Sequence, residues 1–271
     1  MNRIDTTFKK LKEKEESALV GFVTAGDPDY STSLDIVKTM CAAGLDVLEL
    51  GIPFSDPTAD GPLIQRSSAR SLENGTSLSS VLAMTRELRE VTDIPIILFS
   101  YYNPILAFGP AAFYDQAVTA GADGVLVVDL PPEESNEMTK SWPGDELPLI
   151  RLVAPTTPRE RMDYIADTAA GFLYLVSKTG VTGSDGLDLA AVAANTAVLK
   201  SISSLPVCVG FGISTPEDVA SIAATADGVV IGSAFEKIIE DNLENPDLVT
   251  MMGVTVKGLK AATVKGGTFL N

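Results

Sequence analysis

Four carboxylates, those of Asp46, Glu49, Asp56 and Asp60, lie in residues 46–62, which read DVLELGIPFSDPTADGP. Glu49 lies between two leucines in an apolar run that is typical of a buried strand, and Asp56 and Asp60 follow in a loop rich in Gly, Pro and Ser. A carboxyl group in a partly dry site loses the solvation of its charged form, so its pKa rises and it can exchange a proton near neutral pH. Glu49 is therefore a candidate general acid/base, and Asp60 is a candidate partner in the same site.

Ordinary structural roles compete with this interpretation. Glu49 could pair with a buried arginine or with backbone donors, and Asp60 could simply form a turn, which is the common role of aspartate in such a loop. The alternation of side chains along a strand places Val47, Glu49 and Gly51 on one face and the leucines on the other. The choice between these roles depends on what surrounds the strand face that carries Glu49.

The composition excludes several kinds of catalytic site, metal site and binding partner. The chain of 271 residues has no histidine and only two cysteines, Cys41 and Cys208, both in apolar surroundings. Histidine-dependent nucleophilic catalysis, imidazole zinc sites and a disulfide framework are thereby excluded, and we expect no metal site. The formal net charge of −16 argues against nucleic acids and anionic membranes as partners. Because no run resembles a membrane span or a signal peptide, we expect a cytoplasmic protein.

Eight short apolar runs divide the sequence, and segments long enough for helices separate them. The runs are continuous rather than alternating, as expected for parallel strands covered by helices. They lie near Val20, Leu48, Ile97, Val127, Leu152, Tyr174, Val209 and Val230. Eight β/α units in about 250 residues predict an α/β fold of the (β/α)8 TIM-barrel type, with a doubly wound sheet as the alternative. No linker divides the chain, so we expect one domain over residues 1–271 with extra helices at both ends.

In a TIM barrel the active site forms where the strands end and the loops to the helices begin. Glu49 lies near such an end, and Asp60 lies in the loop that follows. Tyr174 lies on the sixth run, where an inward ring either packs in the core or lines the site. The next loop, SKTGVTGSDGLDL, is long and polar enough for a mobile lid, with a plain surface loop as the alternative.

The last two runs end in small residues and lead into predicted helices. Gly210, Gly212, Gly232 and Ser233 would let backbone N–H groups approach an anion, which the positive end of a helix also favours. Loops after strands seven and eight are the usual phosphate site of this fold, although each glycine pair alone could be a tight turn. Thr215 stands where a dinucleotide fingerprint needs its third glycine, and it reads instead as a helix N-cap.

Taken together, the motifs resemble the tryptophan synthase alpha subunit family from about residue 19 to residue 240. The segments that carry the resemblance are LELGIPFSDPTADGPLIQRSSARSL, GFVTAGDP, SYYNPILAFG, DGVLVVDLPPEE, LVAPTTPRER, YLVSKTGVTG, VGFGIS and DGVVIGSA. The first is the most specific, because it joins the acid, the loop prolines and Asp60-Gly61-Pro62. Residues 1–17 and 241–271 are not matched motif by motif.

The resemblance implies a lyase that cleaves indole-3-glycerol phosphate to indole and glyceraldehyde 3-phosphate in tryptophan biosynthesis. It implies Glu49 as the general acid/base and Asp60 as the acceptor for the indole N–H. For the other substrate-binding positions it implies Phe22, Phe99, Leu126, Tyr174 and the lid residue Thr182. For the phosphate it implies Gly183, Gly212, Gly232 and Ser233.

The resemblance also implies a partner and excludes a cofactor in this chain. The alpha subunit works with a tryptophan synthase beta subunit, which holds pyridoxal phosphate and receives the indole, in an α2β2 heterotetramer. The loops DPTADGP and YYNPILAFG and the lid would face that partner.

Two other functions remain open on the residues alone. A phosphorylated-sugar isomerase or a Schiff-base aldolase could use the same barrel, although no apolar run carries a lysine in its interior. A catalytically silent phosphate-binding subunit that switches a partner is the alternative from another class.

Overall fold

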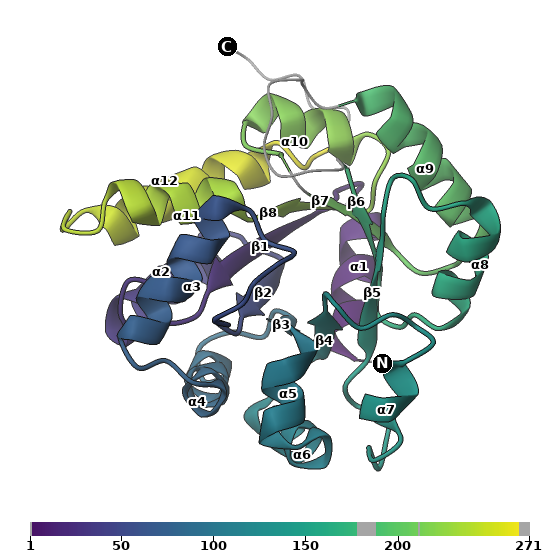
Figure 1. Ribbon diagram of the computed structural model, residues 1–271. Coiled ribbons are helices and arrows are strands. Elements are labelled where there is room, and N and C mark those ends of the chain that lie inside the picture. Colours follow the sequence, from purple (N-terminus) through teal and green to yellow (C-terminus); the bar gives the residue numbers. More distant parts are fainter. Residues whose placement is uncertain (1, 178–187, 211, 266–271) are drawn as a thin grey trace.

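Eight parallel strands close into a barrel in chain order, and β8 pairs with β1 to complete the ring (Figure 1). The computed structural model describes residues 2–177, 188–210 and 212–265. The strands are β1 Ala18–Thr24, β2 Val47–Gly51, β3 Ile96–Ser100, β4 Gly124–Val127, β5 Leu149–Val153, β6 Leu173–Val176, β7 Val207–Gly210 and β8 Gly228–Ile231. The predicted TIM barrel is confirmed, and the doubly wound alternative is wrong.

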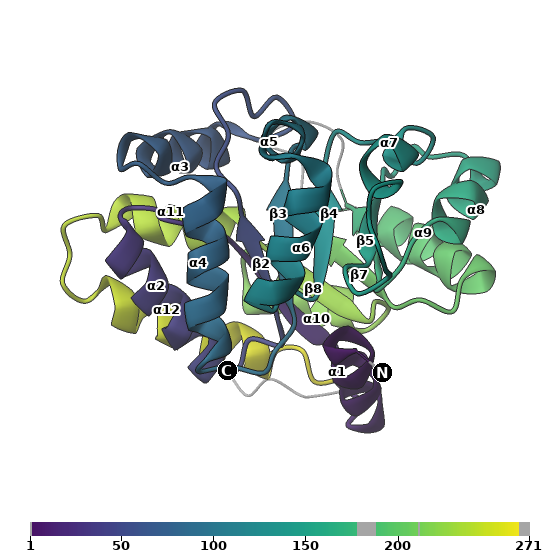
Figure 2. The same ribbon diagram turned by 90° about the horizontal axis from the view of Figure 1, so that it is seen from below.

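Helices surround the barrel on its outer side, except the first, which lies across one end of it (Figures 1 and 2). They are α1 Arg3–Glu13, α2 Tyr30–Ala42, α3 Pro62–Glu73, α4 Leu78–Arg89, α5 Tyr102–Phe108, α6 Pro110–Ala120, α7 Ser135–Thr139, α8 Arg159–Asp167, α9 Leu189–Ile202, α10 Pro216–Ala223, α11 Ser233–Asp241 and α12 Leu248–Ala261. The extra terminal helices are α1 and α12. The stretch YYNPILAFG, expected as a loop, instead forms α5. Of the described helices, none combines the length and the apolar character needed to cross a bilayer.

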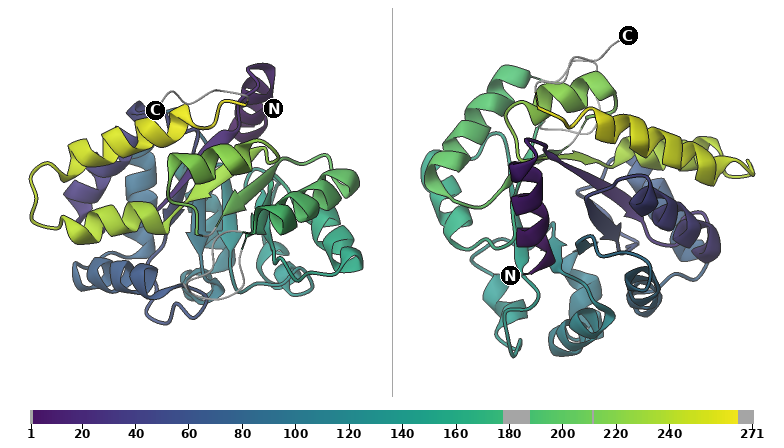
Figure 3. Two further views of the ribbon diagram at one scale, coloured as in Figure 1. Left: turned by 90° about the horizontal axis from the view of Figure 1, so that it is seen from above. Right: turned by 180° about the vertical axis from the view of Figure 1, so that it is seen from behind.

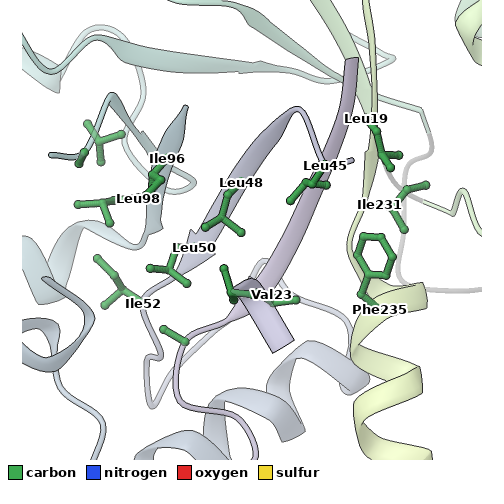
Figure 4. Packing of buried hydrophobic residues seen from close by; sticks show 14 of the residues in the cluster. Leu19, Val23, Leu45, Leu48, Leu50, Ile52, Ile96, Leu98, Ile231 and Phe235 are labelled. Carbon is green, nitrogen blue, oxygen red and sulfur yellow. The ribbon is translucent and has the colours of Figure 1, made fainter. Parts of the chain in front are cut away.

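The strands separate two apolar cores, because successive side chains of a strand point to opposite faces. Leu48 and Leu50 of β2 belong to the outer core, between the strands and the helices, in the same cluster as Val23, Leu45 and Phe235 of α11 (Figure 4). Val47 belongs to the inner core, inside the barrel. The predicted division of β2 into a leucine face and a face shared by Val47 and Glu49 is therefore confirmed.

Helix α1 closes the amino-terminal end of the barrel (Figure 3). Its buried side chains Ile4, Phe8 and Leu11 join the inner core. The ring of Phe8 lies 5.9 Å, centroid to centroid, from the ring of Phe172, which immediately precedes β6. Because this end of the barrel is filled, a substrate must enter from the opposite, carboxyl-terminal rim.

Candidate active site

Glu49 points into the barrel near the carboxyl end of β2, and its side chain is fully buried. In the strand register it lies beside Phe22 of β1 and Ile97 of β3. Neither carboxylate oxygen has a hydrogen-bond partner among the described residues. Among the described residues, neither an arginine nor a backbone N–H group pairs with Glu49. The purely structural role considered for this glutamate is therefore not observed there.

The surroundings of Glu49 keep it protonated at neutral pH. Burial raises its pKa to about 8, because the charged form loses water without gaining a donor. Tyr174 of β6 and Cys208 of β7 face the same interior, and a negative charge on Glu49 would raise the pKa of each further. Glu49 is thus an acid that can give a proton near pH 7 and take one back.

Asp60 lies in the loop after β2 and accepts a hydrogen bond from Tyr101. The Tyr101 hydroxyl lies 3.0 Å from Asp60 Oδ2 and also accepts the N–H of Ala59 at 2.9 Å. Burial raises the pKa of Asp60 to about 6, and the bond from Tyr101 opposes that rise. Asp60 is therefore mostly ionised at neutral pH, and an ionised carboxylate is the stronger acceptor for an N–H donor.

Sequence reasoning did not single out Tyr101 as a site residue. It directly follows β3, its side chain is 4% exposed, and its ring packs against Phe54 with a centroid separation of 5.2 Å. The available signal was its position, since a hydroxyl at the end of one strand can reach the loop of the neighbouring strand.

Phe22 and Phe99, which the resemblance implies as substrate-binding residues, come together at the rim, and Leu126 is buried in the inner core. The two rings touch edge to face, with centroids 5.0 Å apart and an interplanar angle of 69°. To hold an indole between them, the rings would have to separate to roughly 7 Å, twice the usual carbon contact distance. Gly51 leaves room for Phe22, since a Cβ there would lie 2.8 Å from the ring.

Tyr174 also points into the barrel, and Gly210 of β7 makes space for its ring. A Cβ at Gly210 would lie 2.2 Å from the Tyr174 hydroxyl, so no larger residue fits without moving the tyrosine. The spacing argument had grouped Gly210 with the phosphate loops. In the structure Gly210 is a close neighbour of the Tyr174 hydroxyl, and its place in a phosphate loop stays a prediction.

Gly212, Gly232 and Ser233 lie at the ends of β7 and β8, which are neighbours in the barrel. Gly212 has a φ of +76°, a left-handed conformation that favours glycine, and the space where its Cβ would stand is open. Helix α11 begins at Ser233, and no side chain caps it at Gly232. The first N–H groups of a helix have no partner within it, so this helix start can receive an anion.

The start of α10 differs from that of α11. Thr215 caps α10 by accepting from the N–H of Asp218, and the Asp218 side chain accepts in return from the N–H of Thr215. This capping box confirms the predicted N-cap. Of the two neighbouring helix starts, α11 is the one whose first turn lacks a side-chain cap. Two predicted positions, Thr182 and Gly183, lie outside the described residues.

The barrel and its rim define a class of protein, namely TIM barrels with a buried carboxyl group near the carboxyl-terminal rim. Comparison with known proteins gives the family. The family model described as "Tryptophan synthase alpha chain" matches residues 8–264. This chain belongs to the tryptophan synthase alpha chain family.

Individual relatives agree with this assignment. The tryptophan synthase alpha chain of Desulfatibacillum aliphaticivorans is 62% identical over 263 residues, which are 97% of this chain and 99% of the relative. That of Desulfosudis oleivorans is 60% identical with the same coverage. A crystal structure of the alpha subunit from Legionella pneumophila is 42% identical and superimposes with a TM-score of 0.88, covering 97% of this chain and 98% of that one.

Proposed function

We propose that Glu49 is the general acid/base and Asp60 the indole-binding acid of a carbon–carbon lyase. As a member of its family, the chain cleaves indole-3-glycerol phosphate to indole and glyceraldehyde 3-phosphate in tryptophan biosynthesis. The observation that carries the assignment is that Glu49 is buried inside the barrel rim without a hydrogen-bond partner among the described residues. Such a carboxyl group has no structural bond to lose when it transfers its proton.

The proton balance of this retro-aldol reaction suits a single acid/base. Indole C3 gains a proton, the bond from C3 to the side chain breaks, and the hydroxyl on the departing carbon loses its proton as it becomes an aldehyde. Glu49, protonated at the outset because its pKa is about 8, gives the first proton. The carboxylate that remains can take the second, so the enzyme returns to its starting state.

Asp60 would stabilise the charge that develops on the ring nitrogen. Protonation at C3 leaves positive charge on the indole N–H, and an ionised carboxylate that accepts this N–H stabilises the intermediate. The bond from Tyr101 opposes the rise in the pKa of Asp60 and so favours the ionised acceptor. In this proposal Phe22 and Phe99 enclose the ring, with Leu126 and Tyr174 deeper in the barrel.

The glycerol phosphate would extend from the indole toward β7 and β8. A Cβ at Gly232 would lie 3.4 Å from Cβ of Phe22, so the uncapped start of α11 is adjacent to the aromatic pair. Binding of the phosphate by Gly212, Gly232 and Ser233 would hold the reacting carbon near Glu49. Gly183 and Thr182 complete this proposed site from the segment outside the described residues.

The chain works with a beta subunit in an α2β2 complex, and the pyridoxal phosphate belongs to that subunit. We propose that α5 and the loop after β2 face the partner, because Leu106 of α5 is 52% exposed beside the rim. We also propose that the protein acts in the cytoplasm, in keeping with a biosynthetic enzyme.

The decisive experiment measures indole release by wild type and Glu49→Gln, with and without added beta subunit. Gln has the same shape but cannot transfer a proton, so we expect kcat to fall by about 10²- to 10⁴-fold while KM changes little. Glu90→Gln, at an exposed position after α4, is the matched control and should keep wild-type kinetics. Full activity of Glu49→Gln would reject Glu49 as the acid/base.

A further inference from the structure

Glu236 is a second fully buried glutamate, and the mechanism above does not use it. It lies in the first turn of α11, three residues after Ser233. Helix α11 packs against β1, α3 and α12. An acid in the first turn of a helix usually faces solvent and complements the helix dipole, so complete burial requires another explanation.

The carboxyl group of Glu236 joins the start of α11 to the end of β1. Its Oε1 accepts the backbone N–H of Thr24, the last residue of β1, at 2.5 Å. Its Oε2 is buried and accepts no hydrogen bond from the described residues. Asp27, in the loop after β1, is close enough for its charge to raise the pKa of Glu236. One carboxyl oxygen is thus anchored, and the other is buried in the vicinity of a second acid.

The charges around Glu236 balance only when it is neutral. Arg70 of α3 donates two hydrogen bonds to Asp27, at 2.8 and 2.7 Å, and a third to Glu240 at 2.8 Å. Arg66 donates two more to Glu240. Two arginines therefore match two ionised acids, and a charge on Glu236 would be unmatched.

The remaining neighbour of α11 supplies no further cation to this cluster. Lys260 of α12 is already paired with Glu16 and Asp46, each at 2.9 Å. Asp27 uses both carboxylate oxygens as acceptors for Arg70, so the proton belongs on Glu236. Burial and the charge of Asp27 together raise the pKa of Glu236 to about 8.

We propose that Glu236 is a positioning residue whose protonated carboxyl group, bonded to Thr24 and facing Asp27, holds the first turn of α11 in the geometry that binds the substrate phosphate. This inference rests on the proposed phosphate site at Gly232 and Ser233. Loss of the proton would place two buried carboxylates against each other and displace the start of α11. Phosphate affinity should then fall as the pH rises through about 8.

The test is calorimetric titration of the full chain with glycerol 3-phosphate between pH 7 and 9.5. Above pH 7 a phosphate monoester is already mostly dianionic, since its second pKa is about 6, so the ligand contributes little to the change. We expect wild-type affinity to fall at least 5-fold across this range. Glu236→Gln, whose amide can accept from Thr24 and donate to Asp27, should bind within 2-fold of the same affinity throughout.

Two further variants separate the possible causes. Glu49→Gln should keep the wild-type decline, which shows that the titration of Glu49 is not responsible. Glu236→Leu, which removes both the titration and the bond to Thr24, should bind more weakly at every pH but without the decline. Circular dichroism at each pH confirms that the variants are folded.

The outcomes are distinguishable. A pH-independent wild type, or the same decline in Glu236→Gln and Glu236→Leu, would overturn the role of Glu236 and leave the phosphate site intact. Failure of every variant to bind glycerol 3-phosphate at any pH would reject the phosphate site, and the positioning role with it.

Discussion

Glu49 is an acid that the fold keeps uncharged, and this has a consequence for stability as well as for catalysis. In the folded chain its pKa is about 8, whereas an ordinary glutamate titrates near 4.5. Between these two values the folded chain retains a proton that the unfolded chain has lost. Stability should therefore be complete below about pH 4.5 and should fall as the pH rises toward 8.

Replacing Glu49 by Gln should remove this pH-dependent loss. At pH 7 we expect the free energy of unfolding of the variant to exceed that of wild type by roughly 3 kcal/mol. The wild-type chain loses about 1.36 kcal/mol of stability for each pH unit above the pKa of the unfolded glutamate. The two proteins should differ little at pH 4. Urea unfolding at both pH values measures the difference, and Glu236 contributes equally to both proteins. An equal stability difference at the two pH values would contradict the buried, protonated state of Glu49.

Residue positions were predictable where they depend on strand period, and not where they depend on side-chain reach. The alternation in β2 was enough to direct Glu49 inward. Tyr101 binds Asp60 only because the ends of β2 and β3 are adjacent and its hydroxyl turns toward the loop. Glu236 was not recognised because a glutamate near a helix start has an ordinary role at the surface, and its burial depends on how α11 packs.

At the scale of elements, the strands were easier to predict than the helices. Each strand appeared as a continuous apolar run between turn residues, because both of its faces are covered. The segment between β2 and β3 instead folds into two helices, α3 and α4, and the one after β3 into α5 and α6. Pro62 and Pro110, each at a first helical position, were the local signals for two of these starts.

The starts of α10 and α11, beside the proposed phosphate site, should respond differently to removal of a hydroxyl group. Thr215→Ala removes the cap of α10 and should lower the free energy of unfolding by about 1 kcal/mol, with little change in KM. Ser233→Ala removes no cap, because Ser233 is already the first residue of α11, and should raise KM several-fold with little change in stability. Urea unfolding and steady-state kinetics of both variants measure this. The reverse pattern would place the phosphate at α10.

At the scale of the whole molecule, the barrel divides stability and chemistry between its two ends. The amino-terminal end is filled by α1, whose Arg3 also forms a salt bridge of 3.0 Å with Asp123 before β4. The carboxyl-terminal rim carries the proposed site and a fully buried acid without a partner among the described residues. Burying that acid costs free energy, which the apolar burial in the two cores offsets.

Phe8 of α1 allows this division to be tested. The Phe8→Ala variant removes a ring that is 7% exposed and packs near Phe172, so we expect a loss of about 3–4 kcal/mol in unfolding free energy. Because the site lies at the other end, kcat and KM of the folded fraction should stay within about 2-fold of wild type, a difference of only about 0.4 kcal/mol. Lys9→Ala, at the neighbouring exposed position, should change neither quantity. A large fall in kcat at temperatures where the Phe8→Ala variant is folded would contradict this expectation. It would mean that the packing of α1 controls the geometry of the carboxyl-terminal rim, so that the two ends of the barrel are coupled through the inner core.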